Sequence, residues 1–306
     1  MKIIRGNMHE DCVLAMGKFE CIHLGHKDLI GEVTRLAKNA RMPSTVMVFD
    51  PHPIAVLVDM DYKVLFTIEE RAAILEGLGI DYMLVCPFND KFAALSPAEF
   101  CDMLFDQLRA KIVVVGKEYR FGKWREGTVT VLQERAVSSG SMVYGITPNL
   151  QDSAFSDEKK KISTSAIRSL ISANRLPEAT QLLGFPFFVQ GVVSKGRQLG
   201  RELGFRTLNL YPPKDKFLPV DGVYASQVLV NGMVYQGITN VGLRPTVSSG
   251  ETVRTVETHL LDYDGGDLYG QEIRAELLYF IRPEQRFDSL EALKAQIHKD
   301  IELRNK

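Results

Sequence analysis

The sequence contains few cysteines and no excess of charge of either sign. Its four cysteines, Cys12, Cys21, Cys86 and Cys101, are not spaced as metal ligands are. Cys86 ends an apolar run and Cys101 falls in a helical pattern, so the cysteines are predicted to be reduced packing residues. The formal net charge is −1, which excludes the overall basic field that attracts nucleic acid or an anionic membrane.

Long apolar runs, cleavage-site patterns and internal repeats are also missing. No run approaches the roughly 20 apolar residues that cross a membrane. Residues 1–19 lack the apolar segment and small-residue site of a secretory signal, so we expect a cytoplasmic protein. The 306 residues, 45% hydrophobic and 25% charged, are enough for two domains that each bury a core.

Short apolar runs alternate with helical patterns in the first half of the sequence. The runs are 13–16, 46–49, 82–85, 111–116 and 142–146. Between them, a capping box at Thr67 and Glu70 and the start signal at 96–99 predict helices. Buried strands joined by amphipathic helices form parallel sheets covered on both faces, so this half is predicted to be a doubly wound α/β domain.

The second half is rich in strand patterns. A polar segment at 152–161, predicted to be a loop, precedes two short helical patterns near 164–173 and 177–183. The predicted strands are 187–193, 222–230, 233–242, 255–261 and 272–281, and a helix follows at 289–303. Asn231-Gly232 is a strong hairpin signal. We expect a small antiparallel β-barrel with a terminal helix, and domains at 1–184 and 185–306.

The stretch 17–27, GKFECIHLGHK, follows the first predicted strand and leads into a helix. Doubly wound sheets bind ligands at the carboxyl ends of their strands. Gly17 would let the backbone approach a ligand there, and His23 and His26 lie on one side of the helix start. The helix N-terminus adds N–H groups and partial positive charge. Together these features predict a polyphosphate site suited to nucleotidyl transfer.

Two other interpretations of the histidines stay open on pattern alone. A histidine near a strand end is often a hydrogen-bonded structural residue. Two histidines at this spacing also occur in zinc sites, although the sequence offers no third ligand nearby.

Several phrases of the sequence, taken in order, resemble the motifs of one family. GKFECIHLGH (17–26) is similar to the signature G-x-F-D-G-x-H-x-G-H of the bacterial bifunctional riboflavin kinase/FAD synthetase family. VFDPHP (48–53), VVVGKEYRFGKWREG (113–127) and KISTSAIR (161–168) resemble its later motifs, and the likeness covers nearly the whole chain. It implies an FMN adenylyltransferase domain, in which the FMN phosphate attacks the α-phosphorus of ATP and yields FAD and pyrophosphate.

The resemblance also implies roles for individual residues. His23 and His26 would contact the ATP phosphates. The rest of the nucleotide site would comprise Gly17, Phe19 and Gly25, with Ser163, Ser165 and Arg168 from the later motif. The flavin side would comprise Asp50, Pro51, His52, Pro53 and Arg125. On pattern alone, the favoured interpretations are a solvated helix charge for Arg168 and a turn residue before proline for Asp50, and only the other motifs outweigh them.

Four positions in the first half depart from the family pattern. Glu20 stands where the family has aspartate and Cys21 where it has glycine. Lys18 and Glu118 replace a frequent asparagine and a usual aspartate. A side chain at position 21 would cost about 1 kcal/mol or more if the backbone there required positive φ. These changes motivate the alternative of a weakened adenylyltransferase half.

The stretch 196–210, GRQLGRELGFRTLNL, leads from a glycine-rich turn into a predicted strand. Its glycines, Gly196, Gly200 and Gly204, allow close backbone approach to phosphate. Thr207 and Asn209 lie two apart, hence on one side of a strand, and offer hard oxygen ligands for Mg²⁺ bound to ATP. Taken alone, such a stretch is more often an ordinary loop, and the spacing of Thr207 and Asn209 favours a polar pair on an edge strand.

This stretch resembles the G-R-x-L-G-F-P-T-A-N segment of the riboflavin kinase domain. The match implies nucleotide binding at the glycines and a Mg·ATP site at Thr207 and Asn209. Arg206 replaces the proline and Leu208 the alanine. Loss of the proline frees φ at position 206 and restores an N–H there.

The segment 256–273, VETHLLDYDGGDLYGQEI, resembles the catalytic strand of that domain. The resemblance implies that Glu257 is the general base, which takes the proton of the ribityl 5′-hydroxyl of riboflavin as the oxygen attacks the γ-phosphorus of ATP. Further matches at 221–226, 240–247 and 280–287 imply nucleotide contacts from Asn240 and flavin contacts from Arg244 and Arg282. A solvent-facing Glu257 is the alternative that pattern leaves open.

The sequence therefore predicts a bifunctional enzyme of flavin-cofactor synthesis. A C-terminal kinase would convert riboflavin to FMN, and an N-terminal adenylyltransferase would convert FMN to FAD, both with ATP and Mg²⁺. The alternatives are a riboflavin kinase alone, with its first half weakened by Glu20 and Cys21, and a flavin-sensing protein without turnover.

Overall fold

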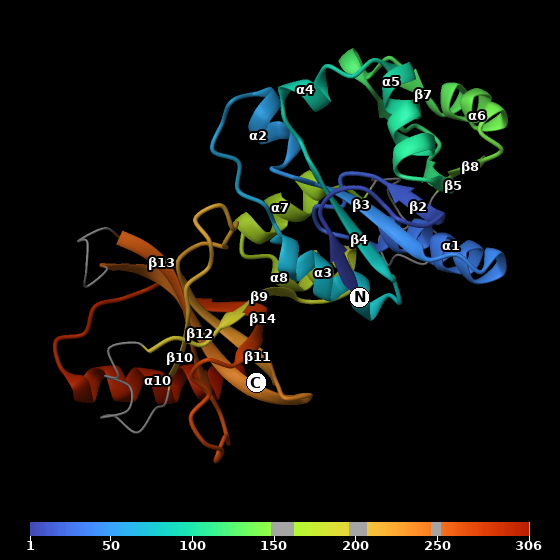
Figure 1. Ribbon diagram of the computed structural model, residues 1–306. Coiled ribbons are helices and arrows are strands. Elements are labelled where there is room, and N and C mark those ends of the chain that lie inside the picture. Colours follow the sequence, from blue (N-terminus) through green and yellow to red (C-terminus); the bar gives the residue numbers. More distant parts are fainter. Residues whose placement is uncertain (148–161, 196–206, 246–251, 306) are drawn as a thin grey trace. The chain divides into compact units, whose positions relative to one another are not determined.

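The computed structural model describes residues 1–147, 162–195, 207–245 and 252–305 (Figure 1). Contacts between residues divide the chain into two compact units, Met1–Ile162 and Ser163–Lys306. Each unit is built around a sheet of its own.

The first unit holds a parallel six-stranded sheet. Its strands are β1 (Lys2–Ile4), β2 (Cys12–Met16), β3 (Ser44–Asp50), β4 (Tyr82–Pro87), β5 (Ala110–Gly116) and β8 (Met142–Ile146). They lie in the order β1-β4-β3-β2-β5-β8, and all neighbouring pairs are parallel. β2, β3 and β5 are almost wholly buried, which agrees with the continuous apolar runs that predicted them.

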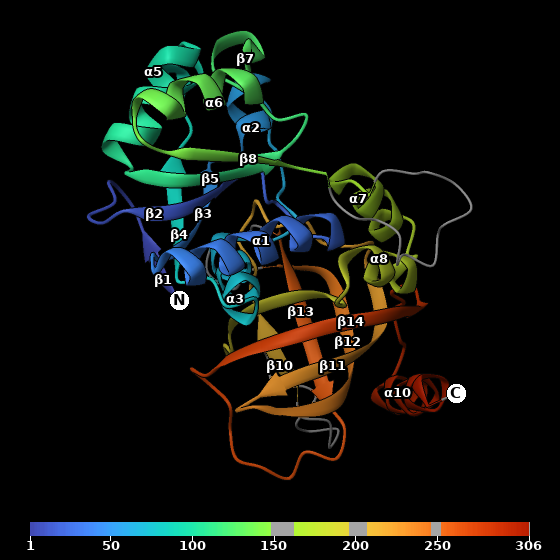
Figure 2. The ribbon, with the colours of Figure 1, turned by 90° about the vertical axis from the view of Figure 1, so that its right-hand side faces the viewer.

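Helices cover both faces of this sheet (Figure 2). One face carries α1 (Leu24–Ala40) and α3 (Ile68–Gly77), and the other carries α5 (Pro97–Asp102), the π-helical turn η1 (Met103–Gln107) and α6 (Val129–Ser138). The short elements are α2 (Pro53–Leu57), α4 (Asp90–Ala93), β6 (Arg120–Phe121), η2 (Lys123–Arg125) and β7 (Gly127–Thr128). Thr67 and Ser96 accept hydrogen bonds from the third residues of α3 and α5, so both predicted helix starts are confirmed. The doubly wound α/β fold is confirmed as well.

The strand order of the first sheet reverses between β2 and β5. The chain runs outward from β2 through β3 and β4 on one side, then crosses to β5 and β8 on the other. In such sheets, the loops that follow the strands at the reversal form the ligand crevice. These loops are residues 17–23 after β2 and residues 117–127 after β5.

The second unit holds an antiparallel six-stranded sheet that curls into a small barrel. Its strands are β9 (Phe187–Val192), β10 (Thr207–Leu210), β11 (Gly222–Val230), β12 (Met233–Pro245), β13 (Thr252–Leu260) and β14 (Glu272–Arg282). The order is β10-β13-β12-β11-β14-β9, and a bridge between Ser194 and Asn209 links the two edges. Asn231 and Gly232, with φ of 49° and 81°, form the predicted hairpin turn. The predicted antiparallel barrel is thereby confirmed.

The barrel is accompanied by α7 (Thr164–Ser172) and α8 (Leu176–Leu183), which precede it, and by α10 (Leu290–Arg304), which follows it. The hydroxyl of the buried Tyr224 donates a 3.0 Å hydrogen bond to Asn174, between α7 and α8, and so ties these helices to β11. α10 lies beside β12 and β14 (Figure 2).

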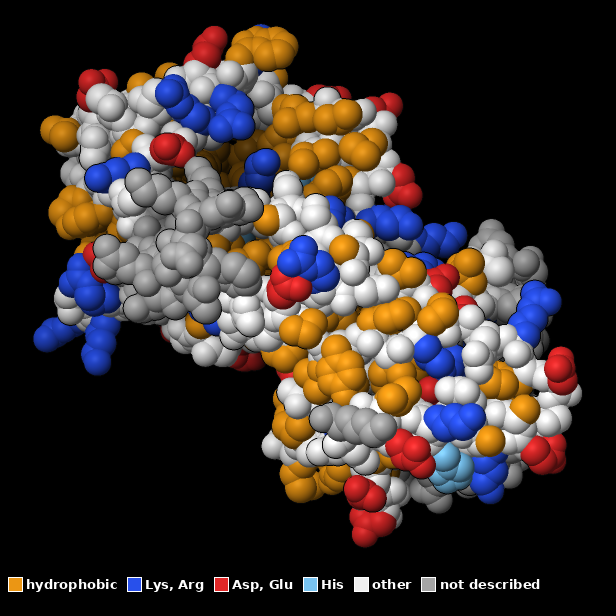
Figure 3. Space-filling model, turned by 180° about the vertical axis from the view of Figure 1, so that it is seen from behind, with side chains coloured by type: hydrophobic (Ala, Val, Ile, Leu, Met, Phe, Trp, Pro, Cys, Tyr) orange, Lys and Arg blue, Asp and Glu red, His pale blue; other side chains and the backbone are white. Residues whose placement is uncertain are grey.

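The surface is mixed in charge. In Figure 3, basic and acidic side chains occur on both units, in agreement with the net charge of −1. None of the helices in the described residues is long and apolar enough to span a membrane.

Two candidate active sites

The first candidate site is the loop between β2 and α1. His23 is the N-cap of α1, and its side chain makes no capping hydrogen bond. The His23 carbonyl accepts hydrogen bonds from the N–H groups of His26 and Lys27, at 2.8 and 3.2 Å. Without a side-chain cap, the start of α1 keeps the partial positive charge that favours a bound anion.

His23 and His26 form a stacked pair at this helix start. Their ring centroids are 3.8 Å apart with 11° between the planes, and the Phe19 ring meets His26 edge-on at 5.0 Å. Both Nδ1 atoms are buried and have no hydrogen-bond partner among the described residues. The two rings are therefore not held through Nδ1, as hydrogen-bonded structural histidines would be.

Burial keeps both imidazoles neutral. Loss of hydration lowers the pKa of His23 to about 4, and burial together with the neighbouring His23 lowers the pKa of His26 to about 3. Neutral rings donate hydrogen bonds to phosphate oxygens, and a bound polyphosphate would raise both pKa values. Among the described residues, no group of three or more His, Cys, Asp or Glu side chains is placed to hold a metal ion, so nothing there supports a zinc site.

The loop before His23 folds into the core. Phe19 and Ile22 are fully buried, and each has a φ of 42°, in the left-handed region. A Cβ on Gly17 would lie 3.0 Å from the Phe19 ring, which is closer than most such contacts, so any larger residue would press on that ring. Cys21 is buried and is not among the residues with positive φ. The backbone strain considered for a cysteine at this position is therefore not present.

Glu20 connects this loop to the segment between α2 and α3. Its carboxylate is buried and accepts hydrogen bonds from the Tyr62 hydroxyl at 2.8 Å and the Leu65 N–H at 3.0 Å. His52 Nε2 lies 3.4 Å from the same carboxylate, and the His52 ring stacks on Tyr62 with 4.4 Å between centroids. The glutamate that replaces the family's aspartate thus has buried partners in a neighbouring segment.

The turn after β3 carries the predicted flavin residues Asp50, Pro51, His52 and Pro53. His52 caps α2 by accepting a 3.2 Å hydrogen bond from the Ile54 N–H, and both His52 and Pro53 are buried. Pro51 is exposed and Asp50 is half-buried. Two of the four residues therefore support the turn from inside, and two face outward at the carboxyl end of β3.

The loop after β5 contains the short β6-β7 hairpin. Phe121 of this hairpin is buried, whereas Arg125 is exposed and has a φ of 60°. Trp124, the single tryptophan of the sequence, is 81% exposed beside it. Arg125 thus faces solvent from one of the two loops at the strand reversal.

Ser163, Ser165 and Arg168 lie at the start of α7, in the second unit. Ser163 is the N-cap and accepts a 3.2 Å hydrogen bond from the Ala166 N–H, and Ser165 is exposed. The Arg168 guanidinium lies 4.7 Å from the centre of the Phe217 ring. Their contact with ATP phosphates stays a prediction.

The second candidate site is a row of polar residues across the barrel. Glu257 of β13 lies opposite Asn209 of β10 and, on its other side, opposite Asn240 of β12. Residues opposite one another on antiparallel strands point to the same face. His259 and Thr207 form the next row on that face. The tertiary fold therefore places side by side three candidate residues that are distant in the sequence.

Glu257 is a largely buried carboxylate, with a side chain only 10% exposed. Arg244 donates a hydrogen bond to its Oε2. Burial raises the pKa of Glu257, the ion pair with Arg244 lowers it in part, and the nearby Glu284 raises it again. Glu257 is therefore not the solvent-facing glutamate that pattern alone left open.

Asn209 is 4% exposed, and its Oδ1 has no hydrogen-bond partner among the described residues. A buried oxygen without a partner costs about 1–3 kcal/mol, which a bound cation would offset. Thr207 is half-buried on the same side of β10, so the two oxygens fit a hard cation such as Mg²⁺. The predicted loop 152–161, the glycines Gly196, Gly200 and Gly204, and the substituted Arg206 lie outside the described residues.

Arg282 and Glu284 lie near the Asn240 end of the polar row across the barrel. Arg282 donates 2.8 Å hydrogen bonds to both carboxylate oxygens of Asp300, which holds α10 on the barrel. Glu284 accepts a 2.7 Å hydrogen bond from Asn240 Nδ2 and packs where a side chain on Gly242 would stand. The Arg282 guanidinium thus has a structural partner.

Two residues that shape these sites were not identified from the sequence. Glu284 lies in the segment 280–287, whose likeness to the family drew attention only to Arg282. Tyr62 lies between α2 and α3, outside every predicted element, and no local pattern marks it as a partner of Glu20.

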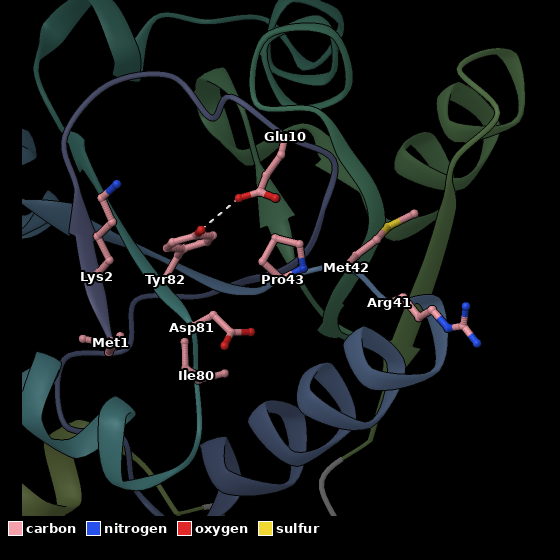
Figure 4. Close-up of a pocket in the computed structure, with 9 residues that line it drawn as sticks. All are labelled: Met1, Lys2, Glu10, Arg41, Met42, Pro43, Ile80, Asp81 and Tyr82. Atoms are coloured by element: carbon pink, nitrogen blue, oxygen red, sulfur yellow. Dashed lines mark hydrogen bonds between the residues drawn. The ribbon is translucent and has the colours of Figure 1, made fainter.

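A hollow of about 550 Å³ lies at the opposite edge of the first sheet, at the amino ends of β1, β3 and β4 (Figure 4). There the Tyr82 hydroxyl donates to Glu10 at 2.8 Å, and Asp81 accepts hydrogen bonds from the Ser44 N–H and hydroxyl at 2.8 and 2.7 Å. Ligands of doubly wound sheets bind at the carboxyl edge, and these carboxylates already have partners. The hollow is therefore not a candidate active site.

Two family models match the chain. The FAD synthetase model matches residues 6–166, and the riboflavin kinase model matches residues 183–306. The bifunctional riboflavin kinase/FMN adenylyltransferase of Escherichia coli strain K12 is 38% identical over an alignment of 309 residues, gaps included, that covers 98% of this chain and 96% of the relative. Its namesake from Bacillus subtilis strain 168 is 34% identical over 293 residues, which cover 94% and 90%.

A solved structure also shares the fold. The crystal structure described as a macrolide-efflux protein from Streptococcus pneumoniae aligns with a TM-score of 0.81 at 29% identity, over 99% of both chains. The arrangement of the two sheets along the chain is thus one that recurs in a known structure.

Proposed function

The chain belongs to the family of bifunctional riboflavin kinase/FMN adenylyltransferases, and on this premise we propose how its residues carry out the two reactions. The protein is an enzyme of flavin-cofactor synthesis. It phosphorylates riboflavin to FMN with ATP, and it adenylylates FMN to FAD with release of pyrophosphate. We assign the adenylyltransferase to residues 1–184 and the kinase to residues 185–306, and we place the protein in the cytoplasm.

In the adenylyltransferase, ATP binds where the strand order reverses. His23 and His26 donate hydrogen bonds to its phosphates, and the start of α1 adds partial positive charge. Negative charge builds on the leaving pyrophosphate as the FMN phosphate attacks, and donors that are already in place stabilise it. Supporting contacts come from Gly17, Phe19, Gly25, Ser163, Ser165 and Arg168.

The flavin of FMN lies against the turn after β3 and the loop after β5. Asp50, Pro51 and Arg125 present groups that face outward. His52 acts from inside, because it holds the shape of the turn through the helix cap and its contact with the Glu20 carboxylate, and the buried Pro53 begins α2 beside it.

In the kinase, Glu257 accepts the proton of the ribityl 5′-hydroxyl as that oxygen attacks the γ-phosphorus of ATP. Burial raises its pKa toward the working pH, which strengthens it as a base. Thr207 and Asn209 hold Mg²⁺, which when bound offsets the charge of the phosphates. Nucleotide contacts come from Asn240, Gly196, Gly200 and Gly204, and flavin contacts from Arg244 and the segment that includes Arg282.

The assignment of the kinase site rests on the positions of Asn209, Glu257 and Asn240. These residues lie opposite one another on three neighbouring strands, so the proposed metal ligand, base and nucleotide contact stand in one row. The test is to supply riboflavin, ATP and Mg²⁺ and to follow the flavins over time. FMN should appear first, and FAD and pyrophosphate should follow. FMN without FAD, even when FMN is supplied, would show that only the kinase is active. Retained flavin without ATP consumption would indicate a flavin sensor.

A further inference from the structure

Arg71 is a buried cation that forms no ion pair in the part of the chain that the structure describes. It lies in the first turn of α3 and is 3% exposed. Its Nε donates a hydrogen bond to the Thr67 carbonyl over 3.4 Å, which is long, and the guanidinium makes no other hydrogen bond with the described residues. Burying an unpaired charge is costly, so the fold by itself gives no reason to keep an arginine there.

The carboxylates that influence Arg71 have other partners. Glu20 accepts hydrogen bonds from the segment between α2 and α3, and an Asp50 oxygen lies 3.4 Å from the Arg5 guanidinium. Glu70 accepts the hydrogen bond that closes the capping box of α3. Burial lowers the pKa of Arg71, and the charges of Glu20 and Asp50 raise it in part, but an arginine stays protonated in either case. Its N–H groups therefore remain available to another acceptor.

Arg71 lies at the edge of the first sheet where substrates are expected to bind. α3 connects the parallel strands β3 and β4, so its first turn stands on the side where β3 ends. The nucleotide loop, residues 17–23, and the flavin turn, residues 50–53, follow β2 and β3 on the same side. Since Glu20 belongs to the loop and Asp50 to the turn, their electrostatic effect on Arg71 places its guanidinium near both segments.

A phosphate group is the acceptor that suits this guanidinium. An arginine presents a planar fork of N–H groups that matches two phosphate oxygens, and the negative charge of the phosphate offsets the buried positive charge. A neutral acceptor would complete the hydrogen bonds but leave the charge uncompensated. We propose that Arg71 binds a phosphate group of FMN or of ATP in the adenylyltransferase. This inference rests on the assignment of FAD synthesis to residues 1–184.

Such a contact helps to bring the two substrates together, because both are anions. An oxygen of the FMN phosphate forms a bond to the α-phosphorus of ATP, and pyrophosphate leaves with the electrons of the broken P–O bond. Arg71 keeps its protons throughout and offsets the repulsion between the two anions. It acts in addition to the neutral donors His23 and His26, to which it adds a full positive charge.

The kinetics of FAD formation in Arg71→Met test the proposal. Methionine removes the charge and the donors but keeps an unbranched side chain, so KM should rise about 10–100-fold for the substrate whose phosphate Arg71 binds. A higher KM for FMN at saturating ATP identifies the phosphate of FMN, and a higher KM for ATP at saturating FMN identifies a phosphate of ATP. Arg71→Lys keeps the charge without the fork, so the same KM should rise less.

Urea denaturation separates substrate binding from a structural role. Since Arg71 is a buried charge without an ion pair, Arg71→Met should unfold at the same urea concentration as the native protein or at a higher one. Arg135→Met is the matched control, because Arg135 is a cation of the same unit that pairs with Asp102 at 2.7 Å. This control should keep the native KM values for FMN and ATP.

Native KM values for both substrates in Arg71→Met and Arg71→Lys would overturn the proposal. Early unfolding of Arg71→Met together with native KM values would show that Arg71 serves the fold, and this too would overturn it. If the native protein itself forms no FAD from FMN and ATP, the assignment of the adenylyltransferase fails as well, so the two failures are distinguishable.

Discussion

The rings of His23 and His26 lie face to face, with 3.8 Å between their centroids. Two imidazolium ions would repel one another at this distance, but burial lowers both pKa values so far that the rings are neutral at pH 7. The stack thus presents two uncharged hydrogen-bond donors where the partial charge of a helix start favours phosphate.

This pair makes the stability of the first unit depend on pH. An unfolded histidine has a pKa near 6.5, whereas burial lowers the pKa of His23 to about 4 and that of His26 to about 3. The stabilising contribution of each histidine is therefore fully present above pH 6.5, and it is lost as the pH falls toward the pKa values of the folded state. Each histidine should lower the free energy of unfolding by about 2 kcal/mol between pH 7 and pH 5. Urea denaturation of His26→Asn at both pH values checks this. The free energy of unfolding of the variant should fall between pH 7 and pH 5 by about 2 kcal/mol less than that of the native protein. An equal fall in the two proteins would contradict the expectation.

His26→Asn should also separate the two activities. It replaces the imidazole N–H that donates to the phosphates of ATP by an amide on a shorter side chain, so the rate of FAD formation from supplied FMN should fall about 10²–10³-fold. FMN formation from riboflavin by the same preparation should not change. His9→Asn is the control, since His9 is exposed and lies outside the crevice. A comparable loss in both variants would argue against the assignment of His26.

Glu257→Gln should have the opposite effect. It keeps the size of the side chain and removes the base, so FMN formation should fall at least about 10²-fold. FAD formation from supplied FMN should stay near the native rate. Parallel assays of the two products check this, and an equal loss of both would mean that the two sites do not act independently.

Tyr62→Phe tests the connection through Glu20. The substitution leaves a buried carboxylate without the 2.8 Å hydrogen bond from the tyrosine, which should lower the free energy of unfolding by about 1–3 kcal/mol. Tyr82→Phe is a matched control, because Tyr82 also donates a 2.8 Å bond to a glutamate, Glu10, but at an exposed position. Its effect should stay within about 1 kcal/mol. If the two variants lost similar amounts of unfolding free energy, the hydrogen bond from Tyr62 would contribute little to the stability of the buried Glu20.

Asn209→Ala tests the metal site. The Mg²⁺ concentration for half-maximal FMN formation should rise about tenfold or more, because an oxygen ligand is lost. The Mg²⁺ dependence of FAD formation should not change. Asn240→Ala should shift the Mg²⁺ requirement less, since Asn240 bonds Glu284 on the other side of Glu257. An unchanged requirement in Asn209→Ala would place the metal elsewhere.

Local patterns predicted most secondary elements because the causes are local. Burial on both faces leaves an unbroken apolar run, as in β2, β3 and β5. A cap such as Thr67 or Ser96 satisfies N–H groups within three residues of itself. β1 was not predicted, because it is three residues long and exists as a strand through its pairing with β4.

The motifs located the candidate residues, but packing assigned several of them unexpected contacts. Gly17 makes room for the Phe19 ring, His52 caps α2, and Arg282 binds Asp300. Each of these residues lies in a matched motif, yet its contact is with the protein itself. A motif specifies a residue type and a spacing, and neither reveals which neighbour the folded chain brings to it.

The amino-acid sequence alone was enough to predict a parallel α/β half and an antiparallel barrel half. It also pointed to side chains suited to binding polyphosphate and to transferring a proton. Long-range packing decided that Glu20 reaches Tyr62, that Asn209 stands beside Glu257, and that Arg244 pairs with that glutamate. The physical reason is the range of the interactions. Caps, turns and apolar periods act over a few residues, whereas these contacts join separate segments that come together only when the sheets form.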